Sequence, residues 1–95
     1  MASKRDLKKD INYLVDEVIG TCMMRQTLND QKTQEEMDKL IREMLDFRED
    51  MLNRVNNPNI EEKTGKAIRN HYRSLYGELL TRVNGVFDRL DAITE

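Results

Sequence analysis

The stretch IRNHYRSLYGELLTRVNGVFDRLDAI, residues 68–93, decides the fold of this 95-residue chain. Its apolar residues recur every three or four positions, the spacing that gathers side chains on one side of an α-helix. The stripe consists of Ile68, Tyr72, Leu75, Leu79, Val83, Val86, Leu90 and Ile93. Leu80 and Phe87 widen it enough to meet two neighbours. We therefore predict a long central helix that other helices must cover.

Two earlier segments carry matching apolar stripes. The first is formed by Leu7, Ile11, Leu14, Val15, Val18 and Cys22, with Ile19 at its margin. The second is broader and is formed by Met37, Leu40, Ile41, Met44, Leu45, Phe47, Met51, Leu52 and Val55. The three heptad-spaced methionines of this set are expected to fill the seam of the bundle, as methionine does in helical cores.

Local signals place the ends of these helices. Thr33 to Glu36 matches the T-x-x-E capping box, which starts a helix, and the Asn56-Asn57-Pro58-Asn59 turn breaks the second stripe. We expect helices at about 4–28, 34–55 and 58–93. The third has two possible starts, at Pro58 or after a loose turn at Thr64-Gly65.

Length and composition favour one all-α domain over residues 1–95. Charged residues make up 36% of the chain and aromatic residues 5%, which suits solvated helices better than a sheet. Short connections favour antiparallel neighbours, so we predict an up-down-up three-helix bundle. Because three helices bury less surface than four, dimerisation would complete such a thin bundle.

The charge balance argues against a general attraction to nucleic acid or membranes. Sixteen basic and eighteen acidic residues are interspersed, for a net charge of −2. The N-terminal stretch lacks the apolar centre of a signal peptide, and no apolar run approaches the roughly 20 residues that span a bilayer. One cysteine, Cys22, fits a reducing compartment. We expect a cytoplasmic protein without membrane contact.

The residues that would carry catalysis do not form a recognisable constellation. The four glycines are isolated, so there is no phosphate-binding loop, and no HExxH, EF-hand or G-x-S-x-G pattern occurs. His71 is the only histidine, and Cys22 falls on the core face as a small apolar residue would. We predict no enzymatic activity, no cofactor, no metal and no small-molecule substrate.

Arg48 is an anomalous charge on the apolar face of the second helix. Its guanidinium must reach out to water or find a carboxylate, and Asp10 or Glu17 of the first helix would lie at its level in an antiparallel hairpin. The functional alternative is an anion site formed by Arg48 with His71 and Tyr72.

Two local clusters of basic residues could contact an anionic partner. The first comprises Lys4, Arg5, Lys8 and Lys9, and the second comprises Lys66, Arg69 and Arg73. Acidic neighbours such as Asp6 and Asp10 dilute the clusters, so a solvated surface is the simpler interpretation. The alternative is a small regulatory protein that binds nucleic acid or another anionic partner.

A second stripe on the first helix suggests self-association. Tyr13, Gly20 and Met24 lie together, nearly opposite the core face. A small residue between two large apolar ones allows a second helix to approach closely. We therefore interpret the chain as a non-enzymatic protein-protein interaction module that forms homodimers or binds a protein partner.

The opening KRDLKKDINYLVDEVI, the NNPN turn and the closing RVNGVFDRLDAI resemble a small uncharacterised all-α bacterial family. The resemblance implies a helical bundle. It implies no activity and no functional residue.

Overall fold

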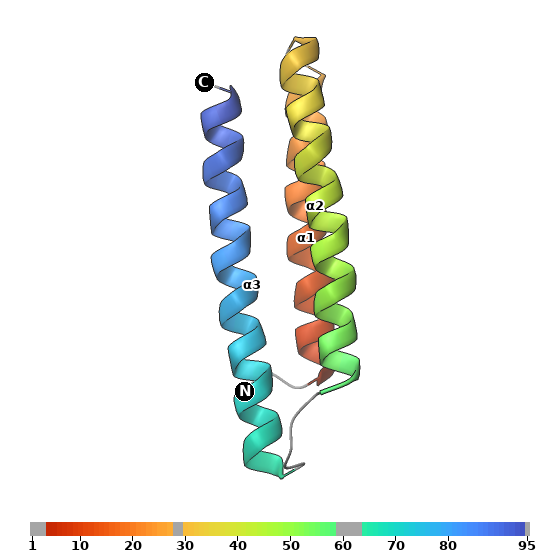
Figure 1. Ribbon diagram of the computed structural model, residues 1–95, viewed down its shortest axis with the longest axis vertical. Helices are drawn as coiled ribbons and strands as arrows, with labels where there is room; N and C mark the ends of the chain where they lie inside the picture. The colour runs from red at the N-terminus through yellow and green to blue at the C-terminus, as the bar shows by residue number, and fades with distance from the viewer. Residues whose placement is uncertain (1–3, 28–29, 59–63, 95) are drawn as a thin grey trace.

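A computed structural model of the protein contains three α-helices (Figure 1). It describes residues 4–27, 30–58 and 64–94. Helix α1 spans Lys4–Gln26, α2 spans Gln31–Asn56 and α3 spans Gly65–Thr94. Over these residues, none of the three helices has an apolar stretch long enough to cross a bilayer.

The helices run up, down and up along one axis, which confirms the predicted all-α three-helix bundle. The molecule is a rod with extents of 51 × 19 × 18 Å. Helices α1 and α2 form the most extensive pair, and α3 lies alongside both (Figure 1). Since α1 and α3 are parallel, their N-terminal ends lie at the same end of the rod.

The core is a continuous apolar seam contributed by all three helices. Each predicted stripe supplies its central residues, and the three heptad-spaced methionines Met37, Met44 and Met51 are fully buried. From α3, the buried residues are Leu75, Leu79, Val83, Val86 and Leu90. No polar or charged residue is buried among the described residues. Hydrophobic burial along this seam therefore holds the helices together.

Helices α2 and α3 do not start at the residues given by the predicted bounds, 34 and 58. Helix α2 begins three residues before Gln34, because the Asp30 carboxylate accepts a 2.8 Å hydrogen bond from the Thr33 backbone N–H and acts as the N-cap. Helix α3 has the later of its two possible starts. The Thr64 hydroxyl accepts a 3.1 Å hydrogen bond from the Ala67 N–H, and Pro58 precedes the helix.

Polar contacts between helices define the register of the bundle. The pairs Arg48–Asp16 and Gln26–Asp38 join α2 to α1, and in each the residue numbers add to 64. Arg54–Glu78 and Arg89–Glu43 join α2 to α3, and there the sum is 132. Between the parallel helices α1 and α3 the Arg25–Asp91 pair has an offset of 66. These three relations give the level of any residue relative to its neighbours.

Two leucines of α2 test the importance of the seam for stability. Leu40 is fully buried, whereas Leu45 is 41% exposed to solvent. We expect Leu40→Ala to lower the free energy of unfolding by about 2–5 kcal/mol, because it removes buried methyl groups and leaves a cavity. Leu45→Ala should cost less than about 1 kcal/mol. Urea unfolding measures both, and equal losses would contradict the burial described above.

Candidate functional site

The functional groups of this protein lie on its surfaces and on the rims between helices, because the described core is entirely apolar. Four ion pairs of the described residues join helices across these rims, and a fifth lies within α2. The candidate sites are therefore the rim clusters, the two basic clusters and the outer face of α1.

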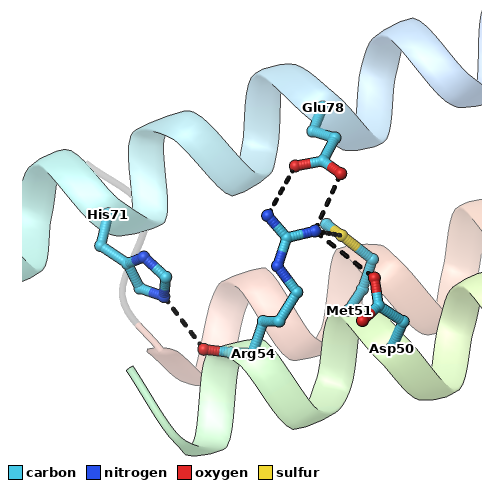
Figure 2. Close-up of polar contacts among 5 residues, drawn as sticks. All are labelled: Asp50, Met51, Arg54, His71 and Glu78. Atoms are coloured by element: carbon cyan, nitrogen blue, oxygen red, sulfur yellow. Dashed lines mark hydrogen bonds and ion pairs between the residues drawn. The ribbon is translucent and has the colours of Figure 1, made fainter. Parts of the chain in front are cut away.

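The most elaborate rim cluster surrounds Arg54, near the C-terminal end of α2 (Figure 2). The Arg54 guanidinium donates two hydrogen bonds of 2.8 Å to the two carboxylate oxygens of Glu78 on α3. It also donates a 3.4 Å bond to Asp50, one turn back on α2. The bidentate hydrogen bond from Arg54 is the main cause of a lowered pKa at Glu78. The fork fixes the lateral position of α3 against α2.

His71 belongs to the same cluster but has a structural role. Its Nε2 lies 3.0 Å from the backbone carbonyl oxygen of Arg54, so the ring N–H donates to that oxygen (Figure 2). Arg54 is in the last turn of α2, where carbonyl groups lack partners within the helix. His71 thus caps the end of α2 from α3.

The glutamates on the α2–α3 rim should make stability depend on pH. The Arg54 fork lowers the pKa of Glu78, and an equivalent contact from Arg89 lowers that of Glu43, both from an ordinary value of 4.5. Their contribution to the free energy of unfolding is therefore complete above pH 4.5 and disappears as pH falls through the lowered pKa. At neutral pH, Glu78→Gln should cost under about 1 kcal/mol, because the pair is partly exposed.

The comparison that decides this prediction is urea unfolding of wild type and Glu78→Gln between about pH 7 and pH 3. The difference in stability should shrink toward zero at the acidic end. Glu49→Gln, at an exposed position of α2, serves as the control. A difference that did not change with pH would contradict the role assigned to the Glu78 charge.

Arg48 lies at the α1–α2 rim, and both ways of accommodating its charge apply. Its side chain is 31% exposed, and it donates a 3.0 Å bond to Asp16. The expectation that Asp10 or Glu17 would be the partner is wrong. The contacts between α1 and α2 centre the hairpin near residue 32 rather than 31, and this register brings Asp16 level with Arg48.

The anion site proposed for Arg48 with His71 and Tyr72 is not assembled. In the α2–α3 register, Arg48 is level with residue 84, which is 13 residues beyond His71. At 1.5 Å per residue this separates the two by about 20 Å along the bundle. His71 is instead bonded to the carbonyl of Arg54.

Replacing Arg48 tests whether its ion pair with Asp16 behaves as a partly exposed pair or as a buried one. We expect Arg48→Met to change the free energy of unfolding by less than about 1 kcal/mol, because the guanidinium is partly exposed and its partner Asp16 is 67% exposed. Thermal or urea unfolding measures the change. A loss of about 3 kcal/mol or more would show instead that the pair behaves as a buried one.

The structure brings part of the two basic clusters together. A groove of about 760 Å³ between the N-terminal halves of α1 and α3 is lined by Lys9 of the first cluster and by Arg69 and Arg73 of the second. Lys4, Arg5 and Lys8 line a separate depression, and Lys66 is exposed near the start of α3. The residues of the two predicted clusters therefore lie in two places. Some share a groove with acidic groups, and the others form a basic end of the rod.

Acidic groups share this groove. Asp6 and Asp10 of α1 line it together with Tyr76 of α3. The Tyr76 hydroxyl is hydrogen-bonded to the Asp10 carboxylate, which raises the pKa of Tyr76. Three basic and two acidic groups leave a small positive excess. The groove consequently offers charges of both signs rather than a dedicated anion pocket.

The outer face of α1 carries the two most exposed large apolar side chains of the described residues. Tyr13 is 65% exposed and Met24 is 68% exposed. Gly20 lies between them, and a Cβ added there would meet no atom within 4 Å. The three residues predicted as a self-association face therefore share an open surface in the structure.

Cys22 is fully buried in the seam, as its place on the core face predicts. Burial raises the pKa of its thiol above the ordinary value of 9.0. The thiol is therefore protonated and covered at neutral pH, which does not suit a nucleophile.

Sequence reasoning did not identify the rim pairs Arg54–Glu78 and Arg89–Glu43. Each arginine sits at the margin of its apolar stripe, and this position is the only sequence signal of a rim role. Which glutamate each arginine contacts depends on the register between α2 and α3, and no local sequence pattern reveals that register.

Comparison with known proteins adds no assignment, because no protein-family model, curated protein or solved structure matches this chain. The resemblance to a bacterial helical family is thus without support.

Proposed function

We propose that this protein is a non-enzymatic interaction module that associates with itself through the outer face of α1. The observation that carries the proposal is the exposure of Tyr13 and Met24 on one face of a bundle whose core is otherwise closed. Large apolar side chains left in water gain free energy when a partner covers them.

Gly20 gives this face its shape. Because no atom lies within 4 Å of the position of a Cβ, the α1 backbone is accessible between the two large side chains. A helix of a second copy can approach closely there, with its own Tyr13 or Met24 beside the glycine. A symmetric homodimer that uses the same face twice is the simplest assembly with this property. We place this module in the cytoplasm, where the reduced thiol of Cys22 is stable.

Truncating the two large side chains should remove association through the α1 face. We expect Tyr13→Ala combined with Met24→Ala to weaken association through this face by about a hundredfold or more, because each buried side chain of this size contributes about 1.5–3 kcal/mol. The folded monomer should keep its stability, since both residues are exposed. Sedimentation equilibrium over a range of protein concentrations measures the dissociation constant.

Two further variants sharpen this experiment. Met23→Ala, adjacent in sequence but on a different side of α1, is the matched control and should leave the dimer unchanged. Gly20→Leu should preserve the monomer, because the added side chain projects into open space, but it should block close approach of a second helix. A wild-type chain that stays monomeric at high micromolar concentration would refute the proposal.

A further inference from the structure

We infer that α3 carries a second self-association surface, on which another copy of this chain docks antiparallel. The surface is a face of α3 formed by Arg69, Arg73, Leu80, Asp88 and Asp91. It is distinct from the outer face of α1, so this inference goes beyond the function proposed above.

The charges on this face are antisymmetric about Leu80. Arg69 lies eleven residues before Leu80 and Asp91 lies eleven residues after it. Eleven residues are close to three helical turns, so the three side chains project from the same side of α3. A two-fold axis beside Leu80 would therefore set Arg69 level with Asp91 of a second copy, and the reverse.

The inner positions repeat this relation. Arg73 lies seven residues before Leu80, close to two turns, whereas Asp88 lies eight residues after it and is therefore about 80° around the helix, at the edge of the face. In the same two-fold arrangement Arg73 comes close to Asp88 of the second copy. One half of the face is thus basic and the other half acidic, with an apolar residue at the centre.

The central part of this face is accessible to a helix. Leu80 is 42% exposed, so its side chain is available to a partner. Gly77, one turn earlier, borders the groove between α1 and α3, and a Cβ there would meet no atom within 4 Å. A second α3 can approach closely at this point and cover Leu80.

The basic half is free to accept new partners. None of the ion pairs within the described residues involves Arg69 or Arg73, although both are exposed on the groove. Lys9, across the groove on α1, adds positive charge to this end. Of the two carboxylates in the groove, Asp10 is engaged by the Tyr76 hydroxyl.

The acidic half retains the capacity to bind. Asp91 receives a 2.7 Å bond from Arg25 at its Oδ1 atom, and a carboxylate accepts several hydrogen bonds through two oxygens. Asp88 is exposed and takes no part in the ion pairs of the described chain. Both carboxylates can therefore face arginines of a second copy.

Charge complementarity selects the antiparallel orientation. In a parallel pair Arg69 and Arg73 would face the same arginines of the second copy, and the aspartates would face aspartates. Like charges across an interface oppose association, whereas complementary ones set its register. Covering Leu80 supplies the apolar contact that exposed ion pairs alone lack.

Two complementary charge reversals test the surface in a chain that lacks the α1 face. Both are made in the Tyr13→Ala, Met24→Ala background. One variant carries Arg69→Glu and Arg73→Glu, which makes the face acidic throughout. The other carries Asp88→Arg and Asp91→Arg, which makes it basic throughout. Sedimentation velocity of each variant, and of their equimolar mixture, reports dimer formation, and thermal unfolding verifies that each is folded.

We expect the background chain to dimerise, and the dimer to weaken as salt rises from about 0.05 M to about 0.5 M. Each reversed variant alone should bind itself at least about tenfold more weakly, whereas the mixture should form a heterodimer. Restoration by mixing cannot be explained by misfolding. Arg42→Glu and Asp46→Arg, exposed on α2, are the matched controls and should change nothing.

The outcomes separate this inference from the proposed function. A background chain that is monomeric, while the wild type dimerises, would leave the α1 face as the self-association surface and overturn the α3 surface. A mixture that does not associate would also overturn it. A short duplex DNA added to the background chain provides one more arm. Binding that Arg69→Glu and Arg73→Glu abolish, by a chain that stays monomeric, would assign the basic half to nucleic acid instead.

Discussion

The continuous apolar seam between the three helices is the constraint on which the rest of the structure depends. Every buried residue described is apolar, and no buried polar group requires a partner. Such a core stabilises the fold by burial alone, and it does little to determine how the helices are aligned along their axes. Methionines at heptad spacing fill it without demanding a particular neighbour. The polar contacts that join one described helix to another are consequently found at the rims.

The rim contacts provide the register that the seam lacks. Arg54 and Arg89 of different helices engage Glu78 and Glu43, and His71 caps the end of α2. Exposed pairs of this kind contribute little free energy. Their geometry nevertheless favours one sliding position among several that would bury similar apolar area. The ends of the helices are then defined, and with them the positions of the charged surfaces.

The surfaces are where a function can reside, and their chemistry differs between helices. The outer face of α1 is apolar around a glycine, whereas the groove-facing side of α3 combines an exposed leucine with charges of opposite sign at its two ends. Tyr13 and Met24 were recognisable from the sequence, because they fall opposite an unambiguous core stripe. The groove was not recognisable, because Lys9 and Arg73 belong to helices whose parallel alignment depends on the whole chain.

The sequence by itself determined the fold class, the three core stripes, the burial of Cys22 and the exposure of the α1 face. Periodicity near 3.6 residues suffices for these, since it depends only on the local geometry of one helix. The tertiary structure alone decided that Arg48 pairs with Asp16 and that Arg54 pairs with Glu78. It also decided that residues of both basic clusters line one groove. These features depend on the offset between helices, which is set by contacts between residues far apart in the sequence and leaves no local pattern in the chain.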